Sequence, residues 1–177
     1  MTARRSAALL AATALAAALT ACAPASAPTP SPTPTGFASE EEAFAAAEAT
    51  YRAYVDALNQ VDLSDPATFE PLFAITTGEL NDIDRKSFSQ LHADGAVVSG
   101  ATKIVSITPL DHESTETRLA ICLDVSAVEL KDADGNSLVQ EDRPDLRAET
   151  ATVERTPDGE SKLASIGDGV DGSKCGE

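Results

Sequence analysis

The sequence predicts an α+β domain in which three N-terminal helices pack on a curved antiparallel sheet of about four strands. Two observations carry this prediction. Between residues 39 and 95, apolar side chains recur at the spacing of an α-helix, and after Gly95 the spacing changes to the two-residue period of a β-strand. Helices that precede a run of strands, instead of alternating with them, are typical of the α+β class.

Signals for helix starts divide the first half of the domain into three segments. Ser39 and Glu42 form a capping box at the head of an Ala-rich run. Asp65-Pro66 opens a second, short helix, with the aspartate as its cap and the proline at its first position. A third helix starts at Thr77 and is stopped by Gly95. The side chains expected to face inward are Phe44, Ala47, Tyr51, Tyr54, Val55, Leu58 and Val61, then Phe69, Leu72 and Phe73, then Leu80, Ile83, Phe88 and Leu91.

The second half reads as an antiparallel meander. Thr102–Leu110 is β-branched and strand-like, and Glu116–Lys131 alternates over a longer stretch. Arg147–Arg155 and Lys162–Ile166 form two more strands, joined by a turn at Pro157–Gly159. In the long alternating run, one face is expected to carry Leu119, Ile121, Leu123, Val125 and Ala127, and the more polar face Ala120, Cys122, Asp124, Ser126 and Val128.

The chain begins with the features of an export signal: the basic pair Arg4-Arg5, an uncharged run rich in Ala and Leu, and small residues before Cys22. The ending Leu19–Cys22 resembles a bacterial lipobox, which implies cleavage before Cys22 and a lipid on its sulfur. The expected domains are a signal peptide at 1–21, a lipidated cysteine with a Pro/Ser/Thr-rich linker at 22–36, and the folded domain at 37–177. A retained membrane helix at the N-terminus is the alternative.

Two further cysteines, Cys122 and Cys175, allow a single pairing once Cys22 is set aside. An exported protein occupies a compartment that permits disulfides. The pairing would hold the glycine-rich C-terminal tail, and two free thiols are the alternative.

The net charge of the chain disfavours one class of binding partner. Twenty-nine acidic residues against thirteen basic ones give a net charge of −16, which disfavours nucleic acid. His92 and His112 lack a ligand at helical i, i+4 spacing, and the sequence holds neither a phosphate loop nor a dinucleotide fingerprint. No metal or cofactor is therefore expected.

The order of elements resembles the cone-shaped α+β fold of the nuclear transport factor 2-like superfamily, also described as SnoaL-like or cystatin-like. The segment Cys122–Ser126, followed by Asp134-Gly135 and a late cysteine, resembles actinobacterial lipoproteins of that group. The resemblance covers roughly residues 38–175. It implies a cavity inside the cone, and it brings in isomerases and cyclases that use a carboxylate base and a phenol donor there.

Asp124 with Tyr51 or Tyr54 is the trio that such proton transfer would use, because an apolar pocket raises the pKa of a carboxylic acid toward neutrality. The leading hypothesis is nevertheless non-catalytic. It describes a lipoprotein held through Cys22 at the extracytoplasmic face of the membrane, binding a small apolar ligand, a partner protein or a second copy of itself. The alternatives are an isomerase- or cyclase-like enzyme with Asp124 as general base, and a structural accessory of a cell-envelope complex.

Overall fold

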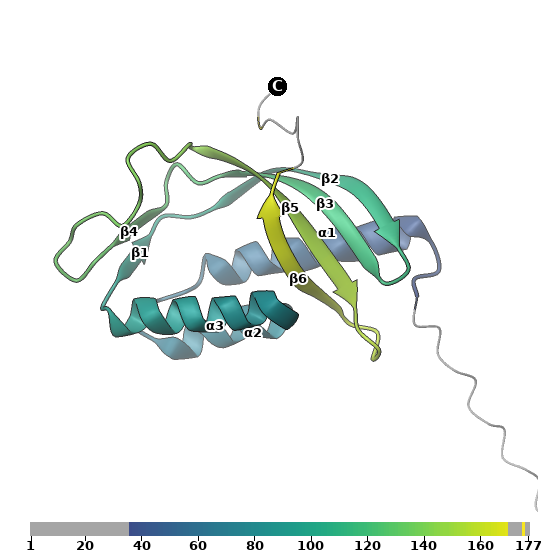
Figure 1. Cartoon of the computed structure of the whole chain (residues 1–177), viewed down its shortest axis with the longest axis horizontal. Coiled ribbons are helices and arrows are strands. Elements are labelled where there is room, and N and C mark those ends of the chain that lie inside the picture. Colours follow the sequence, from purple (N-terminus) through teal and green to yellow (C-terminus); the bar gives the residue numbers. More distant parts are fainter. Residues whose placement is uncertain (1–35, 170–174, 176–177) are drawn as a thin grey trace, which may run out of the picture. The chain divides into compact units, whose positions relative to one another are not determined.

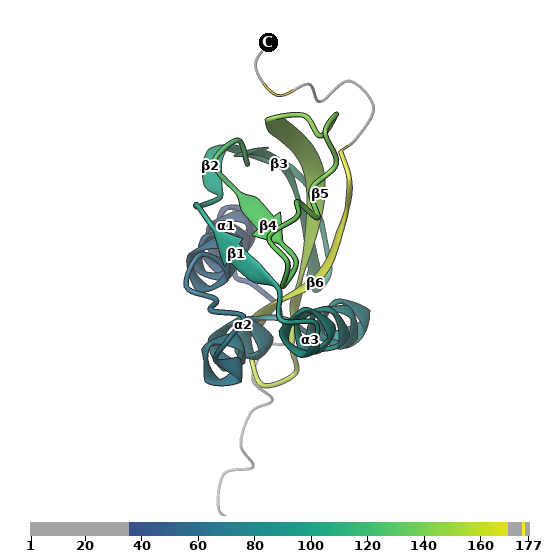
Figure 2. The same ribbon diagram turned by 90° about the vertical axis from the view of Figure 1, so that its left-hand side faces the viewer.

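The computed structural model describes residues 36–169 and Cys175. Its helical part comprises α1 (Glu40–Leu58), the 3-10 helix η1 (Pro66–Phe69), α2 (Glu70–Ile75) and α3 (Gly78–Ala93). Its strands are β1 (Val97–Ser99), β2 (Lys103–Glu113), β3 (Glu116–Asp124), β4 (Glu129–Lys131), β5 (Leu146–Arg155) and β6 (Ser161–Asp168). Figures 1 and 2 show the helices gathered on one side of the larger, curved sheet, which confirms the predicted α+β layout.

The first helix begins where the capping box predicts. The Ser39 hydroxyl accepts a hydrogen bond from the Glu42 amide at 3.1 Å, and the Glu42 carboxylate accepts one from the Ala38 amide at 2.9 Å. Three glutamates in the first turn add favourable charge at the positive end of the helix. The buried side of α1 includes Ala47, Tyr51, Tyr54 and Val55, as the periodicity predicts.

The third helix has a different inner face from the predicted one. Ile83 was expected inside, but its side chain is 51% exposed, and Asp84 is buried instead. At about 100° per residue, Leu80, Asp84 and Phe88 fall on one stripe of α3, whereas Ile83 lies about 100° away from Asp84. The core surface of α3 therefore contains a carboxylate.

The main sheet has four antiparallel strands in the order β2-β3-β5-β6, which confirms the predicted meander. Residues opposite each other in neighbouring strands share a face, so Ile107, Ile121 and Glu149 form one row across three strands. Helix α1 packs along this face and contacts all four strands. The buried side chains of the face include Leu119, Ile121, Leu123, Ala151, Val153 and Leu163.

A second, two-stranded sheet was not predicted. The run Glu116–Lys131 does not continue as one strand, because β3 ends at Asp124 and β4 pairs with β1 in a separate ribbon. The Asp124 carboxylate accepts hydrogen bonds from the Ser126 amide and hydroxyl, a local bond that turns the chain out of the sheet. Ala127, expected on the inner face, is exposed in the turn. Figure 1 shows the β1–β4 ribbon at one end of the main sheet.

Candidate functional site

The two predicted site tyrosines lie together inside the fold. Tyr51 is fully buried and Tyr54 is 8% exposed, and their ring centroids are 6.1 Å apart. Both project from α1 toward the inner face of the main sheet, at the three-residue spacing that brings side chains onto one side of a helix.

Glu149 on β5 is the acidic partner of these tyrosines, and sequence reasoning missed it. The Tyr51 hydroxyl donates a hydrogen bond to Glu149 Oε1. Glu149 is 7% exposed and shares its row with the core residue Ile121. Burial, reinforced by the charge of Glu149 and by this hydrogen bond, raises the pKa of Tyr51 far above its ordinary value. Tyr51 is therefore held as a neutral donor to a buried carboxylate.

Asp84 on α3 adds a second buried carboxyl to the same interior. It is 8% exposed, and its Oδ2 atom receives no hydrogen bond from the described residues. Burial raises the pKa of Asp84 to about 6. Burial raises the pKa of Tyr54 above its ordinary value, and the charges of Asp84 and Glu149 raise it further. Tyr51, Tyr54, Asp84 and Glu149 are called the acid–phenol cluster below.

Asp124 does not join the acid–phenol cluster. It follows the core residue Leu123, and successive strand residues point to opposite faces of a sheet. Its carboxylate is half-buried and accepts hydrogen bonds from the Ser126 amide at 2.9 Å and hydroxyl at 2.6 Å, which lower its pKa. The expected trio of Asp124 with Tyr51 and Tyr54 therefore does not form.

Two of the three cysteines, Cys122 and Cys175, lie within the described residues. Cys122 and Cys175 are joined as a disulfide with their Cα atoms 5.4 Å apart, as the sequence predicts. Cys122 lies on β3, so the bond fastens the C-terminal Cys175 to the middle of the main sheet. Cys22, the expected signal peptide and the expected linker through residue 35 lie outside the described residues.

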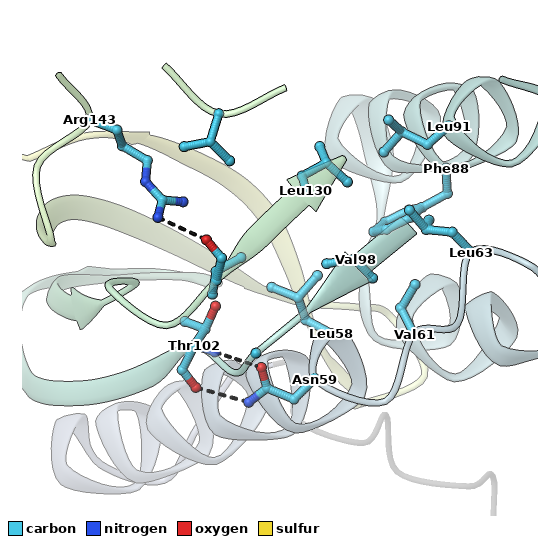
Figure 3. Close-up of a pocket in the computed structure, with 13 residues that line it drawn as sticks. Leu58, Asn59, Val61, Leu63, Phe88, Leu91, Val98, Thr102, Leu130 and Arg143 are labelled. Atoms are coloured by element: carbon cyan, nitrogen blue, oxygen red, sulfur yellow. Dashed lines mark hydrogen bonds between the residues drawn. The ribbon is translucent and has the colours of Figure 1, made fainter. Parts of the chain in front are cut away.

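A pocket opens where α1, α3 and the β1–β4 ribbon meet (Figure 3). Its volume is about 310 Å³. Asn59, Thr102 and Arg143 contribute the side-chain polar groups of the lining. The apolar side chains that line it are Leu58, Val61, Leu63, Phe88, Leu91, Val98, Val128, Leu130 and Val139.

Backbone contacts hold the pocket walls in place. The Asn59 side-chain amide donates to the Thr102 carbonyl and accepts from the Thr102 amide, both at 2.9 Å, which ties the end of α1 to the start of β2. Gly100, with φ +79°, passes the turn after β3 so closely that a Cβ would stand 1.8 Å from the Ala127 carbonyl oxygen. Glycine is required at this crossing.

The pocket and the acid–phenol cluster follow one another along helices α1 and α3, about one helical turn apart. On α1, the pocket residue Leu58 follows Tyr54 by about one helical turn, and on α3 Phe88 follows Asp84 in the same way. The apolar pocket therefore lies toward the C-terminal ends of both helices, and the cluster lies one turn nearer their N-termini.

Within the described residues, metal-ligating side chains do not gather in groups of three or more. None of the helices in residues 40–93 combines the length and hydropathy that crossing a bilayer requires.

Two of the three missed residues, Glu149 and Asp84, had a weak signal in the sequence. Glu149 has the same strand parity as Ala151 and Val153, which a strict alternation places inside. Asp84 has helical spacing to Leu80 and Phe88. Arg143 carried no signal, because it lies in a loop whose position depends on the β1–β4 ribbon.

The architecture is the nuclear transport factor 2-like fold, in which helices cover the inner face of a curved antiparallel sheet. Solved structures with this arrangement match over most of their length. A candidate aromatic ring hydroxylase from Novosphingobium aromaticivorans gives a TM-score of 0.51 at 13% identity, covering 75% of this chain and 92% of that one. A ketosteroid isomerase-like protein from Erwinia carotovora atroseptica gives 0.47 at 16% identity, covering 71% and 93%.

At 13% identity, the match with a TM-score of 0.51 supports the fold alone, and the function must be argued from the site. No protein-family model matches the sequence, and no curated protein matches it either.

Proposed function

We propose that this domain is a non-catalytic binding module for a small, largely apolar molecule, held at the extracytoplasmic face of a membrane by lipid on Cys22. The pocket between α1, α3 and the β1–β4 ribbon carries the binding part of this proposal. Small-molecule sites are usually concave and apolar, with a few polar groups that fix orientation.

The lining supports binding more than chemistry. Its apolar side chains outnumber its three polar ones, and none of the lining residues is a carboxylate, a histidine or a cysteine. The volume of about 310 Å³ is at the small end of the range for ligand sites. A compact ligand with one apolar body therefore fits better than an extended polymer.

The membrane location is supported by the sequence. The lipobox-like ending at Cys22 and the proline-rich linker would place the domain on a tether outside the cytoplasmic membrane. Stable anchoring takes more than one acyl chain, and the lipoprotein resemblance implies two or three.

A pair of valine variants tests the binding proposal. Val98 lines the pocket, whereas its neighbour Val97 is 60% exposed on the same strand. Val98→Phe fills the pocket and should weaken binding of the neutral apolar dye N-phenyl-1-naphthylamine at least tenfold, with Val97→Phe leaving it unchanged. Dye fluorescence measures both affinities. Equal affinities in the two variants would contradict the proposal, and a dimer without dye binding would favour self-association.

Proton transfer is the second candidate function, and the buried carboxyl of Asp84 favours it. With a pKa of about 6 and Tyr54 nearby, Asp84 could exchange a proton with a ligand near neutral pH. This version replaces Asp124 with Asp84 as the general base. Turnover of a ketone substrate abolished by Asp84→Asn but retained by Asp124→Asn would support it.

A further inference from the structure

We propose that the pocket selects a single-chain amphiphile with a carboxylate head, bound by Arg143, with its alkyl chain against the apolar wall. This inference rests on the proposed function and specifies its ligand class.

Arg143 is a half-buried cation without an acidic partner among the described residues. The ion pairs within residues 36–169 involve Arg52, Arg118, Lys131 and Lys162, and none involves Arg143. Arg85, Arg147 and Arg155 also lack an ion pair within the described residues, so what distinguishes Arg143 is its place in the pocket lining. A guanidinium that lines a pocket and lacks a counter-ion can be satisfied by an anionic ligand.

Hydrogen bonds fix Arg143 and leave part of it unused. Its Nη2 atom donates to the Val125 carbonyl at 2.8 Å and to the Val128 carbonyl at 3.0 Å. Its Nε and Nη1 atoms donate no hydrogen bond to the described residues. The loop is tied down a second time, because the Val125 amide donates to the Asp145 carbonyl at 2.8 Å. The guanidinium is thus positioned before any ligand arrives, which lowers the cost of binding.

The pocket has a polar end and an apolar end. In Figure 3, Arg143 lies on one side, with Asn59 and Thr102 below it, and Leu63, Phe88 and Leu91 lie across the pocket. A molecule with one charged head and one apolar tail matches this distribution. The small volume favours one short chain over a two-chain lipid.

The test compares three ten-carbon probes: decanoate, decanol and decyltrimethylammonium. The protein is the chain from residue 22 onward with Cys22→Ser, so that no acyl chain of its own competes for the pocket. Displacement of N-phenyl-1-naphthylamine measures each affinity. We expect decanoate to bind at least tenfold more tightly than the other two, because hydrogen bonds to charged groups are strong.

Substitutions then assign the preference to Arg143. Arg143→Gln should remove the advantage of decanoate over decanol, measured as the ratio of the two affinities within each variant, and Arg143→Lys should restore part of it. Arg147→Gln is the matched control, because Arg147 is exposed on β5 outside the pocket lining. Circular dichroism verifies that each variant is folded.

The outcomes separate the two proposals. Equal binding of decanoate and decanol, blocked by Val98→Phe, would overturn the carboxylate inference and leave the apolar pocket intact. A decanoate preference that survives Arg143→Gln would also overturn it. If no probe binds and Val98→Phe has no effect, both proposals fail.

Discussion

Tyr51 and Glu149, 98 residues apart in the chain, share a hydrogen bond between α1 and β5 inside the fold. The tyrosine is fully buried and the carboxylate nearly so. A buried carboxylate is costly without a donor, and Tyr51 supplies one. The bond therefore links the first helix to the third strand of the main sheet and sets the position of the acid–phenol cluster.

Tyr51→Phe should destabilise the domain by about 1–3 kcal/mol, because it leaves a buried carboxylate oxygen without its donor. Tyr54→Phe is the matched control, since the Tyr54 hydroxyl donates no hydrogen bond to the described residues, and we expect a change within about 0.5 kcal/mol. Urea unfolding at pH 7 measures both changes. Equal losses in the two variants would show that the Tyr51–Glu149 bond contributes nothing of its own.

The fold could be predicted because its long elements have clear periods. The capping box fixed the start of α1, and the alternation of Leu119, Ile121 and Leu123 fixed the inner face of β3. The β1–β4 ribbon was missed because its three-residue strands are too short to show a period.

The candidate site was only partly predictable, for a related reason. Tyr51 and Tyr54 belong to an apolar stripe, so their burial follows from spacing. Asp84 and Glu149 occupy core positions that their charge would ordinarily exclude. Their burial depends on tertiary packing, of α3 on β6 and of α1 on β5, which local sequence does not encode.

Asp84→Asn should change how stability depends on pH. The pKa of Asp84 is raised in the folded state to about 6 from 3.8, so between these values the folded protein binds more protons than the unfolded chain. Its contribution to stability is fully present below about pH 4 and is lost as pH rises through about 6. Burial is the cause of the raised pKa, and Asp84 forms no ion pair within the described residues that would offset it.

The measurement is the difference in unfolding free energy between Asp84→Asn and wild type at several pH values. Between pH 4 and pH 7.5, the variant should gain about 1–3 kcal/mol of stability relative to wild type. Asp82→Asn, an exposed change on the same helix, should show no such rise. A flat profile for Asp84→Asn would contradict the buried, unpaired state of this carboxyl.

Gly100→Ala should disturb the pocket through its wall. The added Cβ would stand 1.8 Å from the Ala127 carbonyl oxygen, and φ is +79°, so both steric overlap and backbone strain oppose it. Gly135→Ala separates the two effects, because Gly135 has φ +88° and open space around it. We expect a loss of about 1 kcal/mol for Gly135→Ala and a clearly larger loss for Gly100→Ala. Thermal unfolding measures both losses. Equal losses would show that the turn at Ala127 can move away from the added Cβ at no cost in stability.

The disulfide between Cys122 and Cys175 should stabilise the domain by closing a loop across 53 positions. On the chain-entropy model this contributes about 4 kcal/mol. Cys175→Ser should therefore lower the unfolding free energy by about 2–4 kcal/mol. The double variant Cys122→Ala, Cys175→Ser should lose only a little more stability, because Cys122 is buried and its truncation leaves a small cavity. Reductant should reproduce the loss in wild type and have no effect on either variant. The disulfide would be shown not to stabilise the domain if neither reductant nor Cys175→Ser changed the unfolding free energy.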